Sequence, residues 1–119
     1  MNNSLLNANS AVWQGGGASG CILNNCTLTA NSAAYLGGGA NGGTLNNCIV
    51  YYNSALNAAN YSNSSLNYSC TTPLPPDGVG NISAEPQLAS ASHLSVGSPC
   101  RRAGSAAKAG GLDIDGEIW

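Results

Sequence analysis

The chain repeats itself about every 22 residues between positions 2 and 74, and this repeat constrains the fold more than any other feature. Two short units recur in phase: the dipeptide Asn-Ser at 9–10, 31–32 and 53–54, and a glycine triplet at 15–17 and 37–39. A fixed period of this size is typical of solenoids, in which each repeat buries its apolar face only by stacking on its neighbours. We therefore expect one coil of the chain per repeat.

Apolar residues alternate with polar ones on either side of an asparagine pair in each repeat. Leu23 precedes one pair, and Cys26 and Leu28 follow it. This alternation predicts short β-strands, whereas glycine triplets and asparagine pairs would break the helices of an α-solenoid. The phase of the alternation changes at Asn25 and Asn47, so both are predicted to form corners in the left-handed backbone conformation and to hydrogen-bond from coil to coil. Three strands and three corners per repeat predict a triangular all-β solenoid.

Three of the five cysteines share one phase of the repeat, namely Cys26, Cys48 and Cys70, with Ser4 one period earlier. We expect them to stack as a ladder of small buried thiols, because free cysteine packs well in protein cores. An odd number of cysteines does not make a closed disulfide framework. The spacing lacks a Cys-x-x-Cys pair, and the single histidine, His93, lies outside the repeats, so no metal site is predicted.

Charge divides the chain into two parts. No Asp, Glu, Lys, Arg or His precedes Asp77, and only 7% of all residues are charged. The change predicts a repeat body at 1–74 and an irregular or capping C-terminal segment at 75–119. Polysaccharide lyases and glycoside hydrolases need carboxylates, a basic residue or bound calcium, which the repeat body lacks. We expect no enzymatic activity and no cofactor.

Partners and location are constrained by the same composition. Three Lys and Arg residues cannot neutralise a track of phosphates, so nucleic acid is not an expected partner. No apolar run approaches the ~20 residues that span a membrane, and the N-terminus lacks the basic and apolar regions of a signal peptide. As given, the chain is expected to be soluble and cytoplasmic. It enters the repeat part-way through, which suggests a piece of a longer array.

The repeat loses its regularity after Asn53, where the glycine triplet is missing and tyrosines appear. Tyr51, Tyr52 and Tyr61 are candidates for contact with a glycan through their rings, and packing at the end of the solenoid is the alternative role. The only acidic cluster, at 113–117, resembles the opening of a calcium loop, but the acidic residue expected further on is absent.

Several segments together resemble a known family: the repeat at 37–50, Asn-Tyr-Ser-Cys-Thr-Thr-Pro-Leu-Pro at 67–75, and Ser-Pro-Cys at 98–100. They are similar to right-handed parallel β-helix repeat proteins of bacterial surfaces, in particular those with a choice-of-anchor type of C-terminal region. The resemblance implies a short right-handed parallel β-helix with 22-residue coils, here a truncated array. It also implies a secreted or cell-surface location and a structural, adhesive or carbohydrate-contacting role.

These observations predict a non-catalytic structural or interaction module. An alternative function is a carbohydrate-binding module that uses exposed asparagines and tyrosines. The first coil, at 2–8, begins a stack and would leave backbone donors and acceptors open at its edge. Such an edge predicts a homo-oligomer that forms by edge-to-edge pairing.

Overall fold

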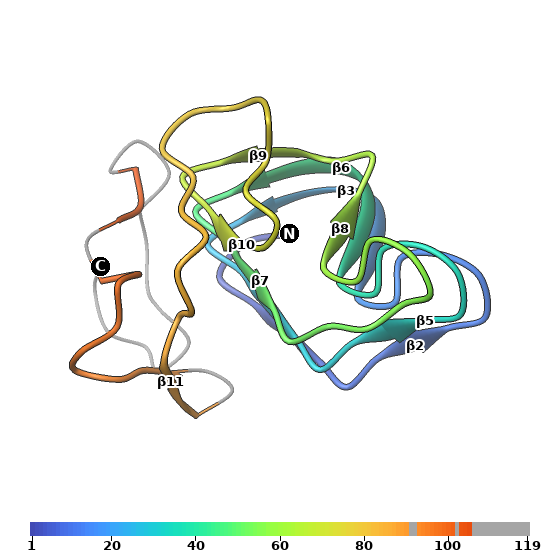
Figure 1. Ribbon diagram of the computed structural model, residues 1–119, viewed down its shortest axis with the longest axis horizontal. Coiled ribbons are helices and arrows are strands. Elements are labelled where there is room, and N and C mark those ends of the chain that lie inside the picture. Colours follow the sequence, from blue (N-terminus) through green and yellow to red (C-terminus); the bar gives the residue numbers. More distant parts are fainter. Residues whose placement is uncertain (91–92, 102, 106–119) are drawn as a thin grey trace.

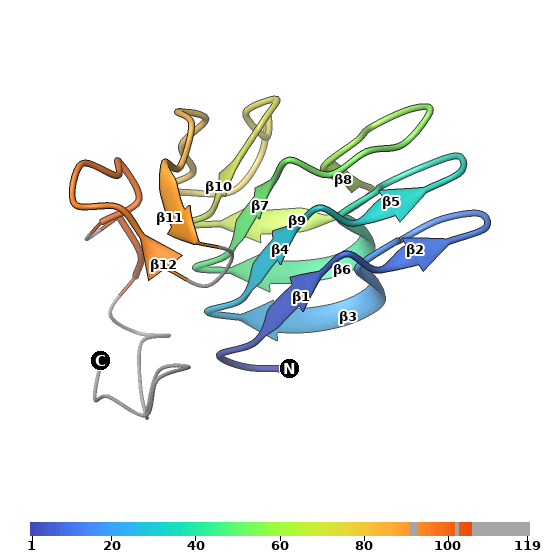
Figure 2. The ribbon, with the colours of Figure 1, turned by 90° about the horizontal axis from the view of Figure 1, so that it is seen from below.

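The computed structural model describes residues 1–90, 93–101 and 103–105, and within these residues it contains β-strands and no helix. The strands form a parallel solenoid of about three turns, with coils roughly 22 residues apart. Figure 1 shows how each coil runs around one interior, and Figure 2 shows the coils stacked as successive layers. The predicted all-β solenoid is confirmed.

Two four-stranded parallel sheets form most of the wall. The β1 sheet has the order β1 (Leu5–Asn7), β4 (Thr27–Thr29), β7 (Ile49–Tyr51) and β10 (Cys70–Thr71). The β3 sheet consists of β3 (Ala18–Asn24), β6 (Ala40–Asn46) and, both paired with β6, β8 (Tyr61–Ser62) and β9 (Ser65–Asn67). A short third sheet pairs β2 (Ser10–Ala11) with β5 (Ser32–Ala33).

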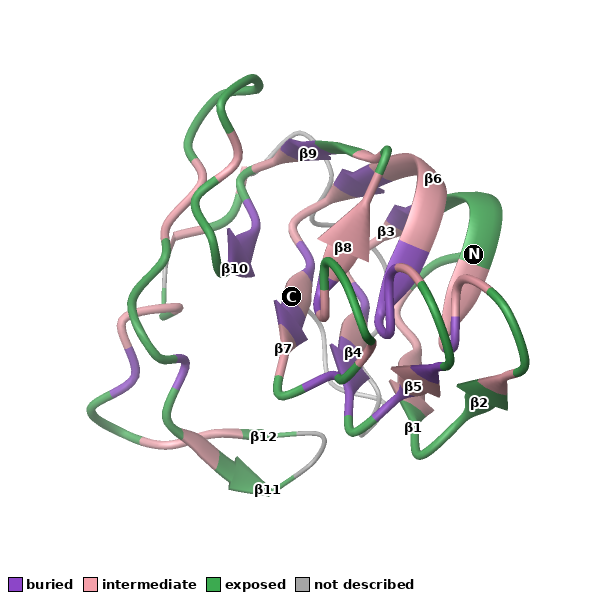
Figure 3. Ribbon diagram, turned by 45° about the vertical axis from the view of Figure 1, so that its right-hand side comes forward, coloured by how far each residue is buried: buried purple, intermediate pink, exposed green. Residues whose placement is uncertain are grey.

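The interior is filled by the apolar residues that the alternation predicted. Leu23 and Leu45 point inward from the β3 sheet, Leu28 and Val50 from the β1 sheet, and all four are at most 1% exposed. Leu66 continues the column of Leu23 and Leu45 on β9. Figure 3 shows the buried residues around this interior and the exposed ones on β2 and the loops. Each coil contributes only a few apolar side chains, so the core exists only because the coils stack.

The asparagine corners are confirmed. Asn25 and Asn47 adopt φ angles of 56° and 53°, in the left-handed region. The Asn47 side-chain amide donates to the Asn25 side-chain oxygen at 3.0 Å, and Asn25 donates to Asn3 at the same distance. Asparagine suits this place because it tolerates the left-handed conformation and its amide both donates and accepts.

The third step of the solenoid is one residue shorter than the others. Ile49 lies opposite Thr27, 22 positions earlier, but also opposite Cys70, 21 positions later. The shortening falls at 55–56, because Ser54 still bridges to Ser32 across 22 positions while Asn57 bridges to Leu36 across 21.

This shortening makes one prediction wrong. Cys70 does not stack on Cys48; Ser69 takes that place, and its hydroxyl accepts a hydrogen bond from the Cys48 backbone N–H at 3.1 Å. Neighbouring strand residues point to opposite faces, so a slip of one residue moves Cys70 out of the interior column. Thr71 instead joins Leu28 and Val50 in the core and is fully buried.

The described part of the C-terminal segment, residues 75–90, 93–101 and 103–105, lies along the outer side of the β1 sheet (Figures 1 and 2). Ile82 bridges to Cys70, and the side-chain amide of Asn47 donates to the Ser105 carbonyl at 2.8 Å. Its own strands, β11 (Leu88–Ser90) and β12 (His93–Leu94), form a small antiparallel pair. The acidic cluster at 113–117 lies outside the described residues.

Candidate ligand-binding surface

Loops that follow β2 and β5 project from the solenoid on the side away from β11 (Figures 1 and 2). The coil register continues into them, because Gln14 bridges to Leu36 and Leu36 bridges to Asn57. Side chains at equivalent loop positions therefore stack from coil to coil, as they do in the walls.

The rings of Trp13 and Tyr35 stack on each other in these loops. Their centroids lie 4.8 Å apart and their planes meet at 11°. Trp13 is 62% exposed and Tyr35 38%. Leu56 occupies the next place in the column, and Val12 precedes Trp13; they are 74% and 91% exposed. We call Trp13, Tyr35 and Leu56 the loop ridge.

The base of the loops is held tightly, and so the loop ridge is fixed to a rigid wall. A Cβ atom at Gly38 would lie 2.1 Å from the Ser54 carbonyl oxygen, which only glycine permits. Below the loops, Asn31 and Asn53 are buried and hydrogen-bonded to each other. Beside the ridge, the Asn41 amide donates to the Gln14 side-chain oxygen at 2.8 Å.

The three tyrosines that the sequence predicted as glycan contacts lie outside the loop ridge. The Tyr51 hydroxyl donates to the Ser83 carbonyl at 3.1 Å, the Tyr52 hydroxyl to the Glu85 carboxylate at 2.6 Å, and the Tyr61 hydroxyl to the Pro73 carbonyl at 2.9 Å. These hydrogen bonds tie the segment after β10 to the solenoid. Glycan contact by these three tyrosines stays a prediction.

Two of the cysteines lie together in the interior of the solenoid. Cys26 and Cys48 stack on adjacent coils and are 2% and 1% exposed. The hydrogen bond between their thiols lowers the pKa of Cys26 to about 7 and, together with burial, raises that of Cys48. Both side chains belong to the buried core cluster, where the pair fills space.

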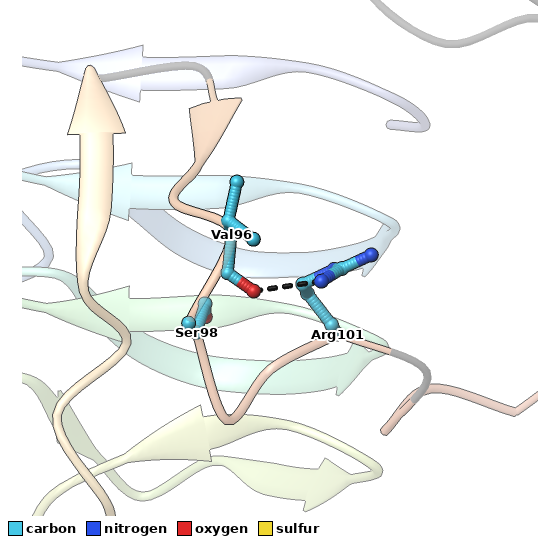
Figure 4. A pocket seen from close by; sticks show the side chains of 4 residues that line it. Val96, Ser98 and Arg101 are labelled. Carbon is cyan, nitrogen blue, oxygen red and sulfur yellow. Dashed lines mark hydrogen bonds between the residues drawn. The ribbon is translucent and has the colours of Figure 1, made fainter.

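Other features of the described residues give weaker support for a binding site than the loop ridge does. Figure 4 shows a shallow hollow lined by Val96, Gly97, Ser98 and Arg101, in which the Arg101 guanidinium donates to the Val96 carbonyl at 2.7 Å. Among the described residues, no group of three or more His, Cys, Asp or Glu side chains is placed to hold a metal ion. Nor does the described part of the chain contain a helix long and apolar enough to cross a membrane.

Sequence reasoning missed the stack of Trp13 and Tyr35, although its signal is present. The two residues are 22 positions apart and both lie two residues before a glycine triplet, at 15–17 and 37–39. Aromatic residues at one phase of a solenoid repeat are expected to meet.

Comparisons with known proteins found no match for this chain. No protein-family model matches the chain, and neither a curated protein nor a solved structure matches it. The chain is therefore described by its architecture: a short parallel β-solenoid with a stacked aromatic pair on its projecting loops.

Proposed function

We propose that this chain is a non-catalytic interaction module that binds a neutral carbohydrate through the loop ridge. The exposed stack of Trp13 on Tyr35 carries the proposal. Tyr35 covers one face of the indole, so the exposure of Trp13 belongs mainly to its other face and its edges. The face of an aromatic ring is electron-rich and attracts the polarised C–H groups of a sugar ring, while the apolar surface of both is removed from water.

Charge supports a neutral ligand. No charged side chain occurs between residues 1 and 76, so the solenoid offers no ion pair to an acidic or basic partner. The polar side chain next to Trp13 in the chain is an amide, that of Gln14, which is half-buried like its partner Asn41. Amide groups donate to and accept from sugar hydroxyls. A stacked ring pair that is already ordered binds with little further loss of side-chain entropy.

Affinity electrophoresis in gels that contain neutral polysaccharides, together with a glycan array, tests this proposal. Trp13→Ala should weaken binding by about tenfold or more, because central aromatic residues contribute most to such contacts. Val12→Ala is the matched control, since this neighbouring side chain is 91% exposed and carries no ring. Unchanged binding in Trp13→Ala with loss in Tyr51→Ala or Tyr61→Ala would move the site to the tyrosines. Absence of binding to any neutral glycan would overturn the proposal.

Self-association through strand edges is a second candidate function, and the sheet order favours it. In the described residues β1, β2 and β3 are each an edge strand of their sheet, and Figure 2 shows them at the same end of the stack. Residues 1–3 cover the edge of β3 only near Ile22 and Asn24. Unpaired strand edges form β-structure with a second copy.

Light scattering over a range of concentrations tests this second candidate. Ser19→Lys places a charge on the exposed part of β3 and should shift the protein toward monomer. Ala89→Lys, an exposed change on β11, is the matched control. A wild-type monomer at high concentration contradicts self-association but leaves glycan binding intact.

A secreted or cell-surface setting belongs to the same proposal. It is supported by the resemblance of 37–50, 67–75 and 98–100 to surface β-helix arrays, and glycans are abundant there. Fractionation of the source cells, with an antibody against this chain, should find it outside the cytoplasm. Recovery only from the cytoplasm would contradict this location.

A further inference from the structure

Cys70 leaves the interior and meets the C-terminal segment. Its neighbour Thr71 points into the core, so Cys70 faces outward from β10. It is nevertheless only 3% exposed, because the C-terminal segment covers it. The Cys70 thiol donates to the Ala84 carbonyl at 3.1 Å, and the backbone at Ile82 is hydrogen-bonded to both Ser69 and Thr71.

Cys100 reaches the same place from a turn further along the chain. The Ser98 hydroxyl holds this turn, since it donates to the Pro86 carbonyl and accepts from the Cys100 N–H at 3.1 Å. Cys100 is half-buried, and the turn sets it against the backbone at Pro86, two residues after the Ala84 carbonyl that Cys70 binds. Two cysteines far apart in the chain, one in β10 and one in the C-terminal segment, thus lie against the same stretch of backbone.

We infer that Cys70 and Cys100 form a disulfide that fastens the C-terminal segment to the outer face of β10. The bond would close a loop that contains most of the irregular segment. It would keep Ser83 and Glu85 against Tyr51 and Tyr52, whose hydroxyls they accept hydrogen bonds from. A closed loop of this kind stabilises the native state chiefly because it restricts the unfolded chain.

The oxidant is a small-molecule disulfide such as oxidised glutathione. The Cys100 thiolate attacks one of its sulfur atoms, which forms a mixed disulfide and releases one thiol. Cys70 then loses its proton and attacks the Cys100 sulfur, which releases the second thiol. In balance, two protein thiols and one small disulfide give one protein disulfide and two small thiols.

The roles within the pair follow from their surroundings. The hydrogen bond from Cys70 lowers the pKa of Cys100, with a further contribution from Ser98, so Cys100 is the sulfur that becomes the thiolate first. The same hydrogen bond and burial raise the pKa of Cys70, which stays protonated until the mixed disulfide forms. Cys100 is also the more exposed of the two and is the one an oxidant reaches.

The other three cysteines are the alternative partners for a disulfide. Cys26 and Cys48 also stack on adjacent coils, but both lie in the core and are at most 2% exposed. Cys21 is exposed on β3, where its thiol donates to the Ser19 carbonyl at 3.2 Å. A disulfide between Cys70 and Cys100 leaves all three reduced.

Oxidation of the whole, folded chain in a glutathione redox buffer tests the inference. Intact mass should fall by two hydrogens, and peptide mapping after alkylation should recover Cys70 linked to Cys100. Cys100→Ser should abolish this product, and Cys21→Ser should leave it unchanged as the matched control. Oxidation should also raise the melting temperature of the wild type and of Cys21→Ser by about 4 °C or more, with no rise in Cys100→Ser.

Three results would overturn the inference. The first is alkylation of both Cys70 and Cys100 after full oxidation, and the second is a peptide that links Cys26 to Cys48 instead. The third is a melting temperature that is the same in oxidising and reducing buffer. Cys70→Ser is a second variant that cannot form the disulfide. Its serine hydroxyl keeps a hydrogen-bond donor for the Ala84 carbonyl, which preserves the packing of the segment. The glycan-binding assay is a separate readout, since the loop ridge lies on the other side of the solenoid (Figure 1).

Discussion

The side-chain oxygen of Asn53 accepts two hydrogen bonds from Asn31, which stands 22 positions earlier in the chain. The Asn31 backbone N–H donates at 2.9 Å and its side-chain amide at 3.1 Å. The side-chain oxygen of Asn31 in turn accepts two hydrogen bonds from Asn9, from its backbone N–H at 2.9 Å and from its side-chain amide at 3.0 Å. Asn60 ends the ladder, because its side-chain oxygen accepts from both amides of Asn53. A solenoid wall of small residues is thus held by a column of amides at one corner.

Removal of one amide from this ladder should destabilise the protein. Asn31→Ala leaves the half-buried Leu6 carbonyl and the backbone and side-chain N–H groups of Asn9 without partners, and it removes one of the two donors to the Asn53 side-chain oxygen. The expected cost is about 1–3 kcal/mol in the free energy of unfolding. Denaturant unfolding followed by circular dichroism measures this cost. Asn2→Ala removes an exposed acceptor of the same chemistry and should cost less than about 1 kcal/mol. Equal losses in the two variants would contradict the role given to burial.

The close approach of two coils at Gly38 leads to a second prediction. Gly38→Ala would place a Cβ atom 2.1 Å from the Ser54 carbonyl oxygen, so the loop base must shift, at a cost of about 3 kcal/mol or more. Gly20→Ala is the control: no atom lies within 4 Å of its Cβ position, and only its φ of +65° is strained. That strain costs about 1 kcal/mol. Thermal unfolding should therefore separate the two alanine variants clearly, and a larger loss at Gly20 would contradict this account.

Tyr52 should titrate well above the ordinary pKa of a tyrosine. Its hydroxyl donates to the Glu85 carboxylate, and this hydrogen bond, with burial, raises the pKa of Tyr52 to about 12 from an ordinary value of 10.0. A raised folded-state pKa means that the stabilisation is complete below pH 10 and is lost as the pH rises toward 12. Absorbance of tyrosinate against pH should show this late step, which Tyr52→Phe removes and Glu85→Gln moves to lower pH. A late step that persists in Tyr52→Phe would assign it to another tyrosine.

The stack of Trp13 and Tyr35 should appear as an energetic coupling. A double-mutant cycle with Trp13→Ala and Tyr35→Ala should give about 0.5–1.5 kcal/mol, as expected for a stacked aromatic pair. A second cycle that combines Trp13→Ala with Val79→Ala, an exposed residue of the C-terminal segment, should be additive. Additivity in the first cycle would mean that the rings do not stabilise each other in solution.

Much of the solenoid follows from local pattern. The asparagine pairs predicted corners at Asn25 and Asn47, and the alternation around them predicted which leucines fill the core. Both predictions are confirmed, because a coil that repeats its neighbour meets it in register. The same logic would have paired Trp13 with Tyr35, which share a phase of the repeat.

The remainder depends on contacts that no repeat encodes. One residue fewer at 55–56 turned Cys70 from the interior to the outside, because strand residues alternate between faces. The hydrogen bond of Cys70 to Ala84, and those of Tyr51 and Tyr52 to the C-terminal segment, join parts of the chain that share no pattern. The sequence alone determined that coils stack and what holds them together, since those interactions recur at a fixed spacing. Only the tertiary structure decided which side chains remain exposed, because the covering segment packs once and without repetition.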